Sequence, residues 1–140
     1  MFDFAWSKKK PSRGKILIVD DEPNIVQTLK DRLEMNDYRV VTAHNGREGL
    51  QKALAEKPDI ILLDVIMPIM DGLEMLEHLR KTNEGKNISV IMLTARSQNQ
   101  DVIRAEACGV DDYIVKPFDL STLIEKIESI LENKRAVSRV

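Results

Sequence analysis

The chain has 140 residues, of which 43% are hydrophobic and 31% are charged, with 21 Lys and Arg against 23 Asp and Glu. This length and balance predict one soluble globular domain with a single core, and they exclude a disordered chain or a membrane-spanning bundle. The formal net charge of −2 gives no global indication of nucleic-acid binding, and the single cysteine, Cys108, excludes an intramolecular disulfide and favours a reducing cytoplasm.

The N-terminal segment, residues 1–13, differs from the rest of the sequence. It contains Phe2, Phe4 and Trp6, which are half of the aromatic residues in the chain. Its apolar stretch is too short for a signal peptide, and the basic residues follow that stretch instead of preceding it. We expect a tail outside the domain, with an anchor for a membrane surface or a partner as the alternative.

Five short segments are apolar and rich in β-branched residues, and each is predicted to form a strand. They are residues 15–20, 38–43, 59–64, 88–93 and 112–116. Most of them lack the alternation of apolar and polar residues that a strand with one wet face shows. This pattern predicts strands that are buried on both sides, as in a parallel sheet covered by helices.

Apolar residues at helical spacing fill the intervals between the predicted strands. The clearest stripes lie within residues 25–33, 50–54, 73–79 and 123–131. The stripe of segment 97–108 is the weakest, since it consists of Val102 and Ile103 with alanines, so this helix should be the most loosely packed. The strict alternation of strand and helix predicts an open, doubly wound α/β domain with five parallel strands.

Chemically active residues follow four of the five predicted strands. Asp20, Asp21 and Glu22 end the first strand, Asp64 ends the third, Thr94 follows the fourth and Lys116 ends the fifth. Parallel strands bring their carboxyl ends to one edge of the sheet, where such folds bind ligands. Carboxylates that meet there repel each other by about 3 kcal/mol per pair at roughly 5 Å. A cluster of hard oxygens that leaves room for water and phosphate favours Mg²⁺ over a closed Ca²⁺ site.

The same residues suit phosphate chemistry. Lys116 offers a compact positive charge and Thr94 a hydroxyl donor, which are groups that hold phosphoryl oxygens. Beside a metal ion, Asp64 becomes a credible nucleophile toward phosphorus, with an aspartyl phosphate as the product. Taken singly, Asp64 has an alternative role as a turn or helix cap, and Lys116 has one as a solvated loop residue.

Four stretches, ILIVDDEPN, DIILLDVIMPIMDG, VIMLTA and GVDDYIVKPF, resemble in order and spacing the receiver domain of bacterial two-component response regulators. The resemblance covers about residues 14–133 and leaves residues 1–13 as an N-terminal tail and residues 134–140 as a C-terminal tail or the stub of a linker. It implies a flavodoxin-like receiver fold with strand order 2-1-3-4-5.

The resemblance also implies roles for the acidic residues. Asp64 would accept a phosphoryl group from a sensor histidine kinase or a histidine phosphotransfer protein. Asp20 and Asp21 would hold Mg²⁺ together with Asp64 and the backbone carbonyl of Ile66. An apolar Ile66 gives an attacking water no hydrogen-bonding anchor, so we expect slow dephosphorylation; Arg96 is the second variable position beside the site.

Three further implications concern the response to phosphorylation. Thr94 and Lys116 would contact the phosphoryl oxygens, and the bond between Lys116 and Pro117 would be cis. Tyr113 would be the aromatic switch that fills the space left when Thr94 moves toward the phosphoryl group. The weakly striped helix and its neighbours would then form the face that meets a downstream effector protein or domain, or a second copy of the chain.

Two other functions compete with this interpretation. A phosphatase of the dehalogenase type requires a second aspartate two positions after the nucleophile, where this chain has Ile66. A fragment of a longer DNA-binding regulator is the other alternative, although no segment of helix-turn-helix size follows Asn133. The sequence therefore predicts a cytoplasmic receiver without enzymatic turnover beyond its own phosphorylation and dephosphorylation, without direct nucleic-acid binding and without a transmembrane segment.

Overall fold

The structure is a computed structural model that describes residues 12–95 and 99–138. Within these residues five strands alternate with five helices. The strands are β1 (Lys15–Val19), β2 (Arg39–Ala43), β3 (Ile60–Asp64), β4 (Ser89–Thr94) and β5 (Asp112–Val115). The helices are α2 (Pro23–Met35), α3 (Gly46–Glu56), α4 (Gly72–Arg80), α5 (Asn99–Ala107) and α6 (Leu120–Ser138). The predicted alternation of strand and helix is confirmed.

All five strands are parallel and form one sheet in the order β2-β1-β3-β4-β5. This is the predicted order, and the doubly wound α/β fold is confirmed. The chain passes from β1 outward to β2 and returns across β1 to β3. The loops after β1 and β3 therefore start side by side and lead away in opposite directions, which is where sheets of this kind bind ligands.

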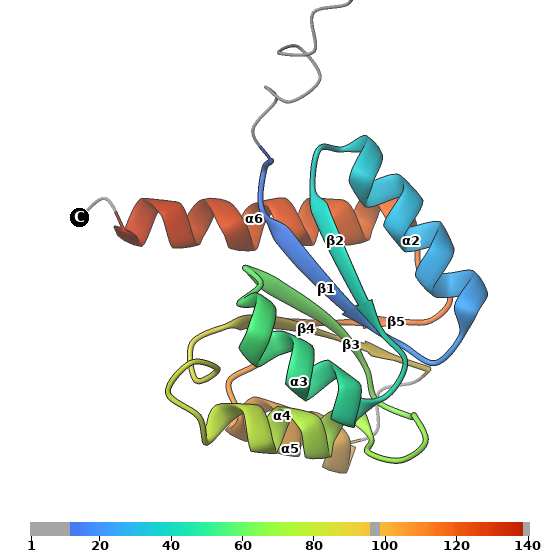
Figure 1. Cartoon of the computed structure of the whole chain (residues 1–140), viewed down its shortest axis with the longest axis vertical. Helices are drawn as coiled ribbons and strands as arrows, with labels where there is room; N and C mark the ends of the chain where they lie inside the picture. The colour runs from blue at the N-terminus through green and yellow to red at the C-terminus, as the bar shows by residue number, and fades with distance from the viewer. Residues whose placement is uncertain (1–11, 96–98, 139–140) are drawn as a thin grey trace, which may run out of the picture.

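Residues of β1 explain why the strands lack polar alternation. Ile16 and Ile18 are fully buried in an apolar cluster with α2 and α6, whereas Leu17 and Val19 are fully buried in a second cluster with α3, α4 and α5. Successive side chains of a strand point to opposite faces, so both must be apolar when helices cover both faces. Figure 1 shows α2 and α6 on one side of the sheet and the other three helices on the other side.

Helix α5 is packed more sparsely than its neighbours. Among its described side chains Ala105 alone is buried, and Ile103 is exposed. By comparison α6 buries Leu123, Ile127 and Leu131 at one-turn spacing. The weak apolar stripe of segment 97–108 therefore corresponds to a thinly packed helix, although the expected start at Ser97 lies outside the described residues.

Helix α6 is longer than the sequence pattern indicated. It continues past residue 133, where we expected the domain to end, and reaches Ser138. The last described turns thus extend the domain helix into the expected C-terminal tail. Of the described helices, none has both the length and the apolar character that a membrane crossing requires.

Arg80, the last residue of α4, joins three segments at the edge where the strands begin. Its guanidinium donates hydrogen bonds to the carbonyls of Cys108 at 2.6 Å, Ile88 at 2.7 Å, Gly85 at 2.8 Å and Gly109 at 3.1 Å. These carbonyls precede β4 and β5. A single half-buried cation therefore satisfies backbone acceptors from the entrances to two strands and the end of α5.

Candidate functional site

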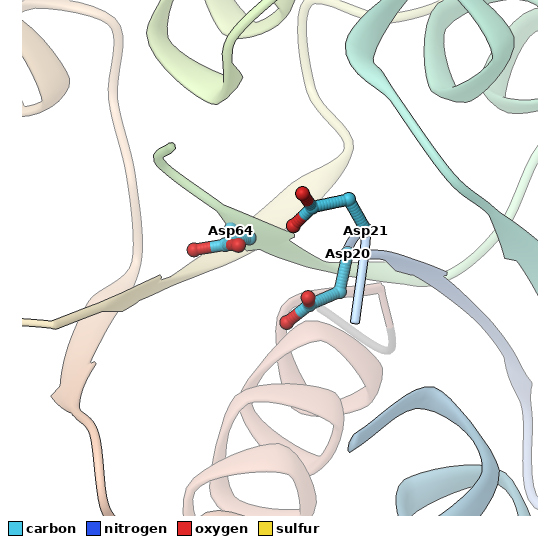
Figure 2. A group of neighbouring side chains, drawn as sticks. All are labelled: Asp20, Asp21 and Asp64. Atoms are coloured by element: carbon cyan, nitrogen blue, oxygen red, sulfur yellow. The ribbon is translucent and has the colours of Figure 1, made fainter. Parts of the chain in front are cut away.

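Three aspartates meet where β1 and β3 end. Asp20 and Asp21 directly follow β1, and Asp64 is the last residue of β3. Since Val19 pairs with Leu63, the residues that follow each of these lie at neighbouring positions on the two strands. One carboxylate oxygen from each aspartate lies within 4.8 Å of the others. In Figure 2 the carboxyl groups of Asp20 and Asp21 turn toward the side on which Asp64 lies.

Two of these carboxylates are buried, so their negative charges need hydrogen-bond donors or positive charges inside the protein. Asp20 is fully buried and Asp64 is 5% exposed, whereas Asp21 is exposed. One oxygen of Asp20 accepts a hydrogen bond from the backbone N–H of Glu22 at 2.9 Å. Its other oxygen lies 3.0 Å from the ammonium nitrogen of Lys116. The buried charge of Asp20 is therefore balanced inside the protein.

Lys116 is the cation of this cluster. Its ammonium nitrogen also lies 3.3 Å from Glu22 and 3.5 Å from Asp64. Burial alone would lower the pKa of Lys116, but the hydrogen bond to Asp20 and the charges of Asp64 and Asp20 outweigh burial and raise it. Lys116 is therefore fully charged at neutral pH. The Lys116–Pro117 bond is cis, as the resemblance implies.

The pKa of Asp64 is shifted in the opposite sense to that of an ion-paired carboxylate. Burial is the largest cause and the nearby negative charge of Asp20 the next, and together they raise the pKa of Asp64 to about 6. Lys116 opposes this shift without cancelling it. The Asp64 anion is therefore disfavoured near neutral pH, and a second positive charge beside this carboxylate would relieve the repulsion from Asp20.

The donor set fits a hard divalent cation. Three carboxylate oxygens within 4.8 Å of one another are too few for a closed Ca²⁺ cage and suit Mg²⁺, which keeps several waters and binds through one or two carboxylates and a phosphate. The repulsion from Asp20, which contributes to the raised pKa of Asp64, also favours a cation here. The carbonyl of Ile66, two residues beyond Asp64, stays a prediction as a further ligand.

The two expected phosphate and switch residues lie on the neighbouring strands. Thr94 ends β4, between the strand of Asp64 and the strand of Lys116, and it is buried. Its carbonyl accepts a hydrogen bond from the Lys116 N–H at 2.7 Å. Tyr113 lies on β5 and contacts α5 instead of the carboxylates, because its hydroxyl donates to the Val102 carbonyl at 3.0 Å.

One member of the site was assigned no role from the sequence. Glu22 was recognised only as an acidic residue after β1, yet its carboxylate contacts Lys116 and its N–H binds Asp20. Adjacency to Asp20 and Asp21 was the available signal. The direction of its side chain could not be inferred, because it depends on where the fifth strand delivers Lys116. The second variable position, Arg96, lies outside the described residues.

Comparison with known sequences identifies relatives of this arrangement. The family model for the response regulator receiver domain matches residues 16–128. The chain is 42% identical over 117 residues to the alkaline phosphatase synthesis transcriptional regulatory protein PhoP of Bacillus subtilis, covering 84% of this chain and 48% of PhoP. It is 39% identical over 120 residues to the response regulator ArlR of Staphylococcus aureus, covering 86% of this chain and 53% of ArlR. The chain thus spans about half the length of these curated relatives.

Solved structures agree with the sequence comparison. A CheY-like response regulator receiver domain protein from Methanospirillum hungatei superposes with a TM-score of 0.84 at 32% identity, over 91% of this chain and 98% of that one. The signal receiver domain of a signal transduction histidine kinase from Syntrophus aciditrophicus gives a TM-score of 0.78 at 38% identity, over 86% and 91%. With the family model matching most of the folded part and both likenesses extending across it, the chain belongs to the response regulator receiver domains of two-component systems.

Proposed function

We propose that Asp64 is the phosphoacceptor of this receiver and that a sensor histidine kinase or a histidine phosphotransfer protein is its donor. The observation that carries the proposal is the convergence of Asp20, Asp21 and Asp64 within 4.8 Å, with Lys116 at 3.5 Å from Asp64. A carboxylate that lies beside a fixed ammonium group and a place for a cation is suited to attack phosphorus, because both positive charges can neutralise the phosphoryl group that it receives.

In the proposed transfer an Asp64 oxygen attacks phosphorus, the P–O bond forms and the P–N bond of phosphohistidine breaks. The imidazole leaves with the electron pair of that bond and takes up a proton. Lys116 would neutralise a phosphoryl oxygen, and the Thr94 hydroxyl would donate to another. Asp20, Asp21, Asp64 and the Ile66 carbonyl would hold Mg²⁺, which, when bound, supplies charge neutralisation for the transferring group.

The response to phosphorylation would pass from Thr94 to the thinly packed side of the sheet. Tyr113 is half-buried and bonded to Val102 of α5, so a change of its rotamer would break a contact to that helix. Because α5 buries little of its described surface, moving it costs less than moving α6. We propose that the face of α5, β5 and α6 binds the effector, or a second copy of the chain once Asp64 is phosphorylated.

A hollow beside the site offers a place for the donor protein. It measures about 600 Å³, lies between the start of α2 and the loop after β5, and is lined by Ile25, Leu29, Pro117 and Phe118 together with Lys116 and Glu22 of the site. We propose that an apolar side chain of the histidine-bearing protein inserts here.

The lifetime of the phosphoryl group is proposed to depend on Ile66. Its side chain is exposed and apolar, so it offers no hydrogen bond to a water that attacks the aspartyl phosphate. Ile66→Asn should speed loss of phosphate, measured as decay of the phosphorylated mass. An unchanged decay rate would contradict this role.

We further propose that the receiver domain extends over residues 14–133, with α6 continuing from it into the C-terminal tail as far as Ser138, and that it works in the cytoplasm, where histidine kinases present their phosphoryl groups. Its only chemistry would be its own phosphorylation and dephosphorylation. Intact-mass measurement after incubation with Mg²⁺ and acetyl phosphate tests the central claim. Wild type should gain one phosphoryl group and Asp64→Asn none, while its circular dichroism spectrum stays native. Equal phosphorylation of both proteins would refute the assignment of Asp64.

A further inference from the structure

The loop that leaves the phosphoacceptor contains a backbone conformation that its sequence disfavours. Three non-glycine residues among those described have positive φ angles: Asp37 at 71°, Lys57 at 49° and Ile69 at 72°. Asp37 and Lys57 directly follow or cap the ends of α2 and α3, where the left-handed conformation is common. Ile69 lies at no helix end and is β-branched, which makes it an outlier.

The fold holds this conformation in place from both ends of the rim loop, residues 66–71. The Val65 carbonyl accepts a hydrogen bond from the Gly72 N–H at 2.8 Å, so the loop closes on the end of β3. Gly72 is in such close contact that a Cβ there would collide with the Asp64 carbonyl oxygen. The Met70 carbonyl is bound by the Gly46 N–H at 2.9 Å. The backbone of Ile69 is therefore fixed by its neighbours.

Packing does not explain why an isoleucine occupies this position. The Ile69 side chain is 71% exposed, so it contributes little to the core. The Met70 N–H donates to the Pro68 carbonyl at 2.8 Å and closes a three-residue turn around Ile69. The positive φ disfavours a β-branched residue by a factor of about 5 to 30 in the folding equilibrium. Asparagine tolerates a positive φ better and would relieve part of that strain. The strained and exposed isoleucine therefore lowers stability without any gain inside the domain.

We infer that Ile69 is a docking residue for the histidine-phosphorylated donor protein, held outward by the strained rim loop so that it contacts an apolar side chain beside the phosphohistidine. This inference rests on the proposed function of Asp64. Asp64 is 5% exposed, so a donor histidine reaches it only if the surrounding protein surface covers the loop that begins next to it. Ile66 and Pro68 are exposed in the same loop and extend the apolar contact.

The occupant is a protein because a small donor does not need the rim. Acetyl phosphate carries its phosphoryl group into the site without covering residues 66–69. A second copy of this chain presents no phosphohistidine, so it gives no reason for an apolar residue at this distance from Asp64. The histidine-phosphorylated protein and acetyl phosphate thus both donate to Asp64 but differ in whether they cover residues 66–69.

The test compares Ile69→Asn with Met35→Asn. Met35 is 78% exposed at the far end of α2, where the backbone is ordinary helix, so it controls for the loss of an exposed apolar side chain. Donors are the histidine kinases encoded in the same genome, each autophosphorylated with ATP, with the fastest taken as reference. Acetyl phosphate with Mg²⁺ serves as the small donor. Urea unfolding reports stability, and size-exclusion chromatography reports self-association.

Ile69→Asn should raise the urea midpoint and slow transfer from the kinase by about tenfold or more, with acetyl phosphate labelling unchanged. Met35→Asn should change neither rate. A higher midpoint with an unchanged transfer rate would overturn the inference, as would equal slowing with both donors or a loss of self-association alone. If wild type accepts phosphate from neither donor, the proposed function itself fails and this inference falls with it.

Discussion

The two edges of the parallel sheet differ in how far their charged side chains are balanced by partners of opposite charge. At the edge where the strands begin, three cations have their own partners. Lys15 lies 3.1 Å from Glu56, and Arg13 lies 2.9 Å from Glu128. Arg80 is surrounded by carbonyl oxygens.

At the edge where the strands end, four carboxylates crowd around one ammonium group. Lys116 lies within 3.5 Å of Asp20, Glu22 and Asp64, with Asp21 close by. Burial first and the negative charge of Asp20 second raise the pKa of Asp64 to about 6, although Lys116 opposes the shift.

This difference distinguishes the charged residues that stabilise the fold from those that form the binding site. Compensated charges at the entrance edge hold segments together, so removing one should destabilise the fold. Uncompensated charges at the exit edge prepare a site for a cation and a phosphoryl group, so removing one should stabilise the fold. Substitutions of similar size are therefore expected to have effects of opposite sign at the two edges.

The largest effect is expected at Arg80. Arg80→Ala should lower the free energy of unfolding by about 3 to 5 kcal/mol, because several half-buried carbonyls lose a charged donor at once. Arg80→Lys keeps the charge but reaches fewer carbonyls, so its loss should be intermediate. Urea unfolding measures both. A loss below about 1 kcal/mol for the alanine variant would show that water replaces the guanidinium without penalty.

Most of the fold was predictable because it depends on local patterns. The five apolar segments and the stripes between them require only the periods of strand and helix, and Ile16 to Val19 are apolar at every position because both faces are covered. The convergence of Asp20, Asp21 and Asp64 was predictable for a similar reason, since parallel strands align their ends.

The unpredicted features are those that depend on three-dimensional details of the loops. Pro68 and the Asp71-Gly72 pair indicate a turn near Ile69, but neither glycine nor asparagine, the usual signals of a positive φ, occupies position 69 itself. Glu22 contacts Lys116, and Arg80 contacts the carbonyls of Cys108 and Gly109, across long sequence separations that no periodic pattern encodes. The part of α6 between Leu131 and Ser138 has no apolar stripe, so the sequence pattern did not predict where this helix ends.

At the exit edge, Asp64→Asn should be more stable than wild type when no metal is present. The pKa of Asp64 is about 6 in the folded chain against 3.8 in the unfolded one, so the folded state holds its proton more tightly. Above about pH 7 the folded wild type carries the unfavourable anion, and the variant should gain up to about 3 kcal/mol. Urea unfolding in the presence of a chelator measures the gain.

The pH dependence of this gain follows from the sign of the shift. A raised pKa contributes stability that is fully present below the unfolded value of 3.8 and is lost as the pH rises through about 6. The difference between Asp64→Asn and wild type should therefore grow from about pH 4 to about pH 7 and then level off. A difference that stays constant over this range would mean that Asp64 does not titrate as an isolated buried acid.

Mg²⁺ should narrow the difference in stability between Asp64→Asn and wild type. At about ten times its dissociation constant a ligand that binds only the folded state adds about 1.4 kcal/mol of stability. Wild type should gain this amount, and Asp64→Asn should gain less because it lacks one of the three carboxylates. Thermal unfolding with and without Mg²⁺ measures the effect, with Ca²⁺ as the comparison ion. Equal gains in both proteins would place the ion elsewhere.

Glu22 should give the smallest effect, because it combines features of both edges. Its carboxylate lies 3.3 Å from Lys116, but its side chain is 59% exposed, so solvent screens the pair. Glu22→Gln should change the free energy of unfolding by less than about 1 kcal/mol, and the stabilisation by Mg²⁺ should stay the same. Asp20→Asn, which alters the fully buried partner of Lys116, is the matched comparison. If Glu22→Gln matched Asp20→Asn in the free energy of unfolding or in the stabilisation by Mg²⁺, side-chain exposure would not distinguish the acids that form the site from Glu22 at its border. The uncompensated charge would then belong to all four carboxylates together.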